Sequence, residues 1–215
     1  MRKKPIISFL LIITFISFAF SVKTFNISQE KLDKFTQKYG EKARIRVLVW
    51  DEMVENAKSK DILHKLKDVN DFFNKIRYET DQSHWNKKDY WAAPFEFMGT
   101  GAGDCEDYAI AKYFTLRKLG VPEDKLRITY VKLLQRGTKY EQAHMVLTYY
   151  HTPSSTPVVL DNVNKILKLA SKRPDLKPVY SFNAQGLWEA KNKGKTSQLV
   201  GKNNLKSWKD LMSRI

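Results

Sequence analysis

The stretch Gly101-Ala102-Gly103-Asp104-Cys105-Glu106-Asp107-Tyr108 holds the only cysteine of the chain and decides the fold that we expect. Residues 109–120, which follow it, place apolar side chains at helical spacing and end at Gly120, a typical residue just beyond a helix C-terminus. Asp104 is a good N-cap, and the small residues before it let the backbone approach its neighbours closely. Cys105 therefore lies in the first turn of a predicted helix.

The position of Cys105 favours a catalytic role for its thiol. In the first turn of a helix, free amide N–H groups and the helix dipole stabilise negative charge, and the thiolate is the nucleophilic form of cysteine. The alternative is a small buried apolar residue without chemistry, which is the usual role of a lone cysteine. Because glycines, a helix start and the partner residues described below accompany it, we expect Cys105 to be a catalytic nucleophile.

The first residues differ in character from the rest of the 215-residue chain. Basic residues 2–4 precede an apolar run over residues 6–20, and a small-x-small pattern follows at residues 19–21. This is the pattern of a signal peptide, and it is short for a membrane-spanning helix. We predict a signal peptide over residues 1–21, with a retained N-terminal anchor as the alternative. In both cases the remainder of the chain is exported.

Composition and charge restrict the function further. One cysteine allows no internal disulfide, so the exported protein relies on its hydrophobic core. The formal net charge of +15 includes the three positive charges of the leader, which has no acids, and leaves +12 for the remainder. Export argues against a nucleic-acid partner, and no arginine-rich recognition stretch is present. We interpret the charge as a solvated surface that attracts acidic partners.

Periodicity in the first half of the exported chain predicts helices. Apolar side chains recur at intervals of three and four residues over residues 27–39, 43–54 and 62–76. The segment from Arg77 to Thr100 is instead a long connection rich in aromatic residues. A structureless stretch of this length is uncommon unless it is functional. Because it leads directly into the cysteine helix, we expect it to form one wall of a cleft.

The second half of the chain changes to a period of two. Alternating side chains predict strands over residues 126–131, 143–150 and 158–161. Beyond Asn164 the patterns are weaker, and we expect a short helix near residues 165–170, an extended segment over 174–182, and a basic, mobile tail with a last helix near Leu205. Helices followed by an antiparallel meander predict an α+β fold.

His144 is the partner that we expect for the cysteine. It alone of the four histidines lies inside a predicted strand, although such a histidine is more often structural. In a hairpin of the second and third strands, Asp161 either faces it directly or lies on the same face two residues along. We expect Asp161 to accept the Nδ1 proton and to leave Nε2 for the thiol. The backbone N–H of Cys105 is one expected oxyanion donor.

The acids around the cysteine indicate a possible cation site. Asp104, Glu106 and Asp107 place negative charge where a thiolate must form, which raises the thiol pKa. Capping explains Asp104, but three acids in four positions are more than capping requires. Ca²⁺ prefers carboxylate oxygens and would cancel the repulsion. The spacing leaves both interpretations open, because no EF-hand pattern is present; Asp104 and Glu106 are the preferred ligands, and Asp107 is a weaker one.

Residues 101–113 resemble the signature of the bacterial transglutaminase-like cysteine proteinases, in particular the LapG-type periplasmic adhesin proteases. The similarity extends to about Trp188, through residues 69–74, 89–91, 126–131, 143–147, 160–162 and 178–183. It implies a papain/transglutaminase-like α+β fold, with N-terminal helices and the cysteine helix packed on an antiparallel sheet that carries histidine and aspartate. We assign this domain to residues 22–190, followed by a basic extension over residues 191–215.

The resemblance also implies a function. Members of this family are calcium-dependent cysteine endopeptidases of the periplasm that cut the N-terminal region of a large surface adhesin, which disperses the biofilm. A periplasmic domain of an inner-membrane cyclic-di-GMP receptor sequesters the protease. The triad maps onto Cys105, His144 and Asp161, and calcium onto Asp104 and Glu106. Neither nucleic acid nor a membrane span after leader removal is expected. The alternatives are a transamidase, which uses the same acyl-thioester, and a non-catalytic binding module.

Overall fold

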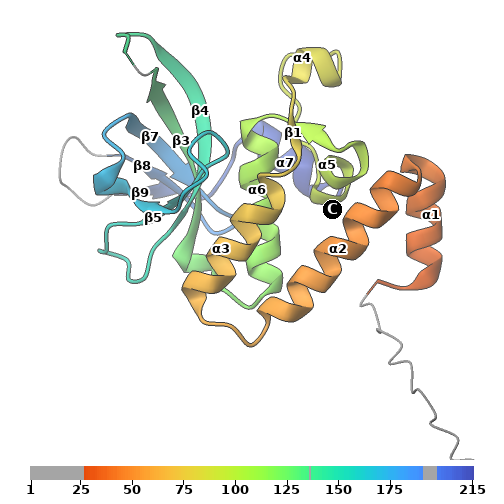
Figure 1. Ribbon diagram of the computed structural model, residues 1–215. Coiled ribbons are helices and arrows are strands. Elements are labelled where there is room, and N and C mark those ends of the chain that lie inside the picture. Colours follow the sequence, from red (N-terminus) through yellow and green to blue (C-terminus); the bar gives the residue numbers. More distant parts are fainter. Residues whose placement is uncertain (1–26, 136, 191–197) are drawn as a thin grey trace, which may run out of the picture.

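A helical part and a sheet part lie side by side in the computed structural model of the protein, which describes residues 27–135, 137–190 and 198–215 (Figure 1). The predicted signal peptide, residues 1–21, lies outside the described residues. Within those ranges no helix has both the length and the apolar character needed to cross a bilayer. The fold is α+β, as predicted.

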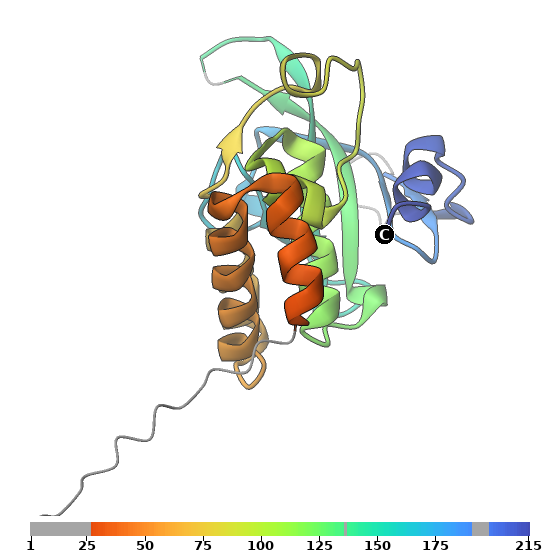
Figure 2. The same ribbon diagram turned by 90° about the vertical axis from the view of Figure 1, so that its right-hand side faces the viewer.

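The N-terminal part consists of α1 (Gln29–Tyr39), α2 (Glu41–Ala57) and α3 (Ile62–Phe73), close to the predicted segments. Figure 2 shows α1 and α2 side by side. Two of these helices begin at a side-chain cap, because the Ser28 hydroxyl and the Asp61 carboxylate each accept a backbone N–H from the first turn. The apolar face of each helix then enters one hydrophobic core.

The aromatic segment from Arg77 to Thr100 is not structureless, contrary to our expectation. It contains β1 (Arg77–Tyr78), α4 (Asp81–His84) and α5 (Pro94–Thr100). These elements are too short for periodicity to reveal them. β1 pairs in parallel with β2 (Ala102–Gly103), which directly precedes α6 (Cys105–Lys118). This pairing holds the aromatic segment against the start of the cysteine helix.

Seven strands form one antiparallel sheet in the order β6-β5-β4-β3-β7-β8-β9. Their bounds are β3 (Leu126–Leu134), β4 (Glu141–Tyr149), β5 (Val158–Leu160), β6 (Lys168–Leu169), β7 (Leu176–Phe182), β8 (Leu187–Glu189) and β9 (Gln198–Gly201). β3 follows the 3₁₀ turn η1 (Glu123–Lys125). The three strands predicted with a period of two are confirmed as β3, β4 and β5. α6 packs against β4 on one side and α3 on the other (Figure 1).

The helix predicted near residues 165–170 is wrong. The structure has the edge strand β6 there, followed by the 3₁₀ turn η2 (Ala170–Lys172). β6 pairs with β5, and the amide of Ala170 adds a hydrogen bond of 2.8 Å to the carbonyl oxygen of Pro157. A helix of six residues is marginal without tertiary support, so the sheet edge determines the conformation of this segment.

The last predicted helix is α7 (Lys206–Met212), and it is packed rather than loose. Trp208 and Leu211 are buried, and the Trp208 ring stacks on Phe114 of α6 with ring centroids 6.0 Å apart. Arg214, just after α7, donates to the carbonyl oxygen of Trp91 at 2.7 Å. α7 therefore joins the same core as the cysteine helix. Residues 191–197 of the predicted tail lie outside the described residues.

Gly103, two residues before the cysteine, has no room for a side chain. A Cβ atom at this position would meet Asp107 Oδ2 and lie 2.8 Å from the Phe97 ring. We expect Gly103→Ala to lower the free energy of unfolding by about 1–3 kcal/mol, because one of these groups must move. Urea denaturation measures this loss.

Gly137→Ala is a comparison that carries the other cost of replacing a glycine, an unfavourable φ. No atom lies within 4 Å of a Cβ at Gly137, so only its φ of 76° is unfavourable for alanine. That conformation costs about 1–2 kcal/mol. If urea denaturation gave no loss of stability for Gly103→Ala, the close packing before the cysteine helix would not be required.

Candidate active site

The start of α6 is fixed by the buried carboxylate of Asp107. Its Oδ2 accepts the backbone N–H of Asp104 at 3.2 Å, and its Oδ1 accepts the backbone N–H of Ala92 at 2.8 Å. Asp107 therefore ties the first helical turn to the aromatic segment. Asp104 is the N-cap residue, so the predicted helix start is confirmed and Cys105 is the first helical residue.

The Cys105 side chain is partly exposed, and its thiol donates to Glu106 Oε2 at 3.0 Å. Burial raises the pKa of the thiol well above its ordinary value, and the charges of Glu106 and Asp104 raise it further. A hydrogen bond from the backbone N–H of Met145 acts in the opposite direction. The repulsion expected from the sequence is therefore present, and without a compensating positive charge it keeps the thiol protonated.

His144 lies on β4 and is 4% exposed. Leu147 of β4 pairs with Leu160 of β5, and this register places Asp161 two residues from the position opposite His144. Of the two registers that we considered, the second is therefore present. His144 Nε2 lies 2.8 Å from Asp161 Oδ1.

Our expectation that Nδ1 of His144 contacts Asp161 is wrong. Because Asp161 is offset along the neighbouring strand, the far nitrogen of the ring, Nε2, reaches it. Burial alone would raise the pKa of the Asp161 carboxyl, but hydrogen bonds from His144, Val163 and Arg173 hold this pKa well below its ordinary value. An ionised carboxylate only accepts hydrogen bonds, so Nε2 carries the proton and Nδ1 is the free nitrogen.

The Asp161 carboxylate is held by two further hydrogen bonds besides the one to the imidazole. Its Oδ1 accepts the backbone N–H of Val163 at 2.9 Å, and its Oδ2 accepts from Arg173 Nη2 at 2.8 Å. Arg173, only 2% exposed, also binds Asp175 at 2.7 Å. A buried chain of alternating charges thus stands behind His144 and fixes the carboxylate.

Loss of Arg173 is expected to destabilise the protein strongly. Arg173→Met leaves the buried Asp161 carboxylate with one charged partner fewer, and breaking a buried ion pair from one side costs about 3–5 kcal/mol. Urea denaturation measures this cost. Arg44→Met is the control, because Arg44 pairs with Asp33 and Glu41 on the exposed side of the N-terminal helices. Equal stability of the two variants would contradict a supporting role of Arg173.

A second buried chain of hydrogen bonds connects the cysteine helix to Asp161. Lys112, two turns after Cys105 on α6, donates to Asn74 Oδ1 at 2.9 Å. Asn74 Nδ2 in turn donates to the backbone carbonyl oxygen of Asp161 at 2.9 Å. Burial lowers the pKa of Lys112 to about 7. These contacts fix the distance between the helix of Cys105 and the strand end that carries Asp161.

Cys105 and His144 line one cavity of about 440 Å³. Aromatic side chains form much of its remaining wall, including Tyr130 and Tyr180, which stack with ring centroids 5.2 Å apart. Tyr78 and Trp91 of the aromatic segment also line it, so the expected cleft wall is present. Asp161 does not line the cavity and reaches it only through the imidazole.

Beside the thiol lies a cluster of carboxylates that could hold a cation. Asp104 and Glu106 are joined by Asp81 and Asp89, which the sequence reasoning missed. They belong to overlapping groups that also include Cys105 and Asp107, and within each group the ligand atoms lie within 4.8 Å of one another. Carboxylate oxygens are the ligands that Ca²⁺ prefers.

The burial and the hydrogen bonding of individual carboxylate oxygens support a cation at this cluster. Among the described residues, Asp81 Oδ1 and Asp104 Oδ1 are buried and have no hydrogen-bond partner. Burial raises the pKa of Asp81 to about 6, and burial followed by the charge of Glu106 raises that of Asp104 to about 8. Buried carboxylate oxygens that lie close together without a hydrogen-bond donor fit a divalent cation better than they fit each other. Asp107 differs, because both of its oxygens accept backbone N–H groups.

The three residues that the sequence reasoning missed differ in how strongly the sequence indicates them. Asp89 belongs to residues 89–91, a block that the resemblance includes, so its participation was within reach of the sequence. Asp81 has only its position at the start of the short helix α4. Arg173 carries no sequence signal, because nothing in its own segment indicates the carboxylate of Asp161.

Comparisons with known proteins agree with this geometry. The family described as bacterial transglutaminase-like cysteine proteinase, BTLCP, matches residues 33–184. The solved structure of calcium-bound LapG from Legionella pneumophila is 48% identical, with a TM-score of 0.72, over 87% of this chain and 99% of that one. EGTA-treated LapG from the same organism is 46% identical, with a TM-score of 0.75, over 89% and 99%. No curated protein sequence matches significantly. The resemblance predicted from the sequence is confirmed.

Proposed function

Because this chain belongs to the bacterial transglutaminase-like cysteine proteinases, we propose that it is a calcium-dependent endopeptidase that cleaves the N-terminal region of a large surface adhesin. The observation that carries the proposal is the hydrogen bond of 2.8 Å between His144 Nε2 and Asp161 Oδ1, beside a cavity that Cys105 also lines. A nucleophile and an oriented base at one cavity are the requirements of acyl transfer.

Each member of the proposed triad has a distinct role. Nδ1 of His144 takes the thiol proton of Cys105, and the sulfur attacks the scissile carbonyl carbon to form a tetrahedral oxyanion. The imidazolium then donates its proton to the leaving amine, and water hydrolyses the remaining thioester with His144 as base. Asp161 orients the ring and stabilises the imidazolium. The backbone N–H of Cys105, free at the helix start, is a proposed oxyanion donor.

Asp104 and Glu106 are the proposed calcium ligands, now with Asp81 and Asp89 as additional members of the set. When bound, Ca²⁺ supplies positive charge beside the thiol and so favours the thiolate. Asp107 positions Asp104 through their hydrogen bond rather than serving as a primary ligand. The similarity to a relative whose solved structure is described as calcium-bound supports this assignment.

The proposed setting of the reaction is the periplasm. The leader pattern in residues 1–21 supports export. The protease domain is assigned to residues 22–190, and the basic extension over 191–215 adds β9 to its sheet and α7 to its core. By similarity to LapG-type proteases, cleavage releases the adhesin and disperses the biofilm. A periplasmic domain of an inner-membrane cyclic-di-GMP receptor is the proposed inhibitor of the protease.

Mass spectrometry of the reaction products tests this function. The exported chain is incubated with N-terminal fragments of candidate adhesins, with and without calcium. Hydrolysis produces two fragments whose summed mass exceeds that of the substrate by one water. A product that joins two chains would instead support a transamidase. Binding of a fragment that stays intact would support a non-catalytic module.

A further inference from the structure

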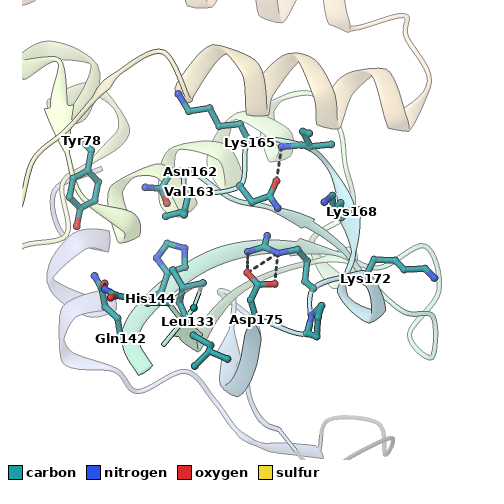
Figure 3. A pocket seen from close by; sticks show the side chains of 17 residues that line it. Tyr78, Leu133, Gln142, His144, Asn162, Val163, Lys165, Lys168, Lys172 and Asp175 are labelled. Carbon is teal, nitrogen blue, oxygen red and sulfur yellow. Dashed lines mark hydrogen bonds and ion pairs between the residues drawn. The ribbon is translucent and has the colours of Figure 1, made fainter. Parts of the chain in front are cut away.

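A second cavity, of about 1070 Å³, adjoins the one that holds the thiol. Tyr78 and His144 line both cavities, so the two meet at the imidazole. The larger one is lined by His144 but not by Cys105, and most of its remaining wall is formed by the segment after β5, residues 162–175. Figure 3 shows His144 at one end of this cavity and Lys168 and Lys172 toward the other. We refer to it as the lysine groove.

The lysine groove has an uncompensated positive charge. Lys165, Lys168 and Lys172 line it, and within the described part of the chain none of them has a carboxylate at ion-pair distance. Lys165 donates only to the backbone carbonyl oxygen of Asn74, at 3.0 Å. The charge of Arg173, by contrast, is neutralised by Asp161 and Asp175. The three lysines therefore offer an anionic ligand a site that no internal acid occupies.

The same groove also has exposed aliphatic side chains. Val163 is 59% exposed and Ile166 is 68% exposed, and both line the groove. Scattered apolar residues on a surface are ordinary, but here two lie in one concave site beside a catalytic imidazole. A ligand that contacts both kinds of side chain has acidic and aliphatic groups.

We infer that the lysine groove is the subsite for the polypeptide C-terminal to the scissile bond, and that it takes an acidic segment containing aliphatic residues. The inference rests on the proposed function. During acyl transfer the N-terminal part of the substrate stays on the Cys105 sulfur, whereas the leaving amine receives its proton from His144. The departing chain therefore begins at His144, the residue at which this groove meets the cavity that holds the thiol.

Peptide binding to the exported chain carrying Cys105→Ala tests the inference directly. The probe is a fluorescently labelled synthetic peptide in which glutamate and valine alternate, and fluorescence anisotropy measures its affinity. We expect Lys168→Glu/Lys172→Glu to weaken binding about tenfold, because two attractions become repulsions. The control, Lys31→Glu/Lys42→Glu, makes the same change in net charge on exposed lysines of α1 and α2 and is expected to weaken binding less than about twofold.

Two outcomes would overturn the inference. Equal weakening in the two double variants would mean that the peptide responds to net charge alone, and undetectable binding to the parent protein would mean that the groove takes no such ligand. A competition arm separates this result from the proposed function. If the adhesin fragment is hydrolysed but the peptide does not slow the reaction, the inference about the groove is wrong and the proposed protease function is retained. If no fragment is hydrolysed, the proposed function is wrong. The difference in peptide affinity between the two double variants then still shows whether the groove binds an acidic peptide.

Discussion

Replacement of Cys105 by alanine is expected to reduce cleavage of the adhesin fragment by about four orders of magnitude or more, since members of a catalytic triad act as a unit. The expected effect on folding is small, because the thiol is partly exposed and its side chain donates only to Glu106. We expect the free energy of unfolding to change by less than about 1 kcal/mol. Mass spectrometry of the products and urea denaturation measure the two quantities.

The single thiol provides an independent control for this prediction. Because Cys105 is the only cysteine in the sequence, a thiol-alkylating reagent modifies one defined position. The remaining activity should fall in proportion to the fraction of chains alkylated, as determined from intact mass. A Cys105→Ala protein that still hydrolyses the fragment, or a fully alkylated protein that remains active, would remove the proposed nucleophile.

Removal of calcium is expected to have the second-largest effect. We expect excess EGTA to lower the cleavage rate by about a hundredfold or more, and added Ca²⁺ to restore it, because burial and the charges of Glu106 and Asp104 otherwise keep the thiol protonated. Binding should also stabilise the fold, by about 2.7 kcal/mol at a calcium concentration one hundred times the dissociation constant. Thermal unfolding of Cys105→Ala with and without Ca²⁺ measures this effect without relying on activity.

Amide substitutions show whether the carboxylate cluster is the calcium site. Asp81→Asn tests the residue that only the structure revealed, and Asp104→Asn tests one predicted from the sequence. Each should weaken the stabilisation by Ca²⁺. Asp68→Asn is the matched control, because Asp68 pairs with Lys60 on the surface and should leave that stabilisation unchanged. Turnover that is equal in EGTA and in Ca²⁺ would contradict a role of the metal in catalysis.

The cysteine helix was predictable because its signals are local. A small-residue stretch, an N-cap at Asp104 and a terminating Gly120 lie within about one helix length of Cys105 and fix both ends of α6. The strands β3 and β4 were predictable for a similar reason, since each is a run of strand-forming residues bounded by turn signals. Where a segment was short, as in residues 165–170, its neighbours in the sheet determined its conformation.

The contact between His144 and Asp161 could be predicted only in part from local sequence signals. Alternation along the strands placed Asp161 on the correct face, but two registers remained possible and the ring nitrogen was assigned wrongly. A change of register by two residues leaves the hydrophobic pattern unchanged, so the pattern cannot distinguish the two. The nitrogen that meets the carboxylate depends on this offset.

By itself the sequence determined the family, the α+β order of elements and the helix that carries the proposed nucleophile, because the signals for each are residues that are close together in the chain. Only the tertiary structure decided which nitrogen of His144 meets Asp161. It alone placed Asp81 beside Asp104 and Arg173 behind the carboxylate. The physical reason is that these contacts join segments whose relative placement follows from the packing of the whole core, and no local propensity encodes that placement.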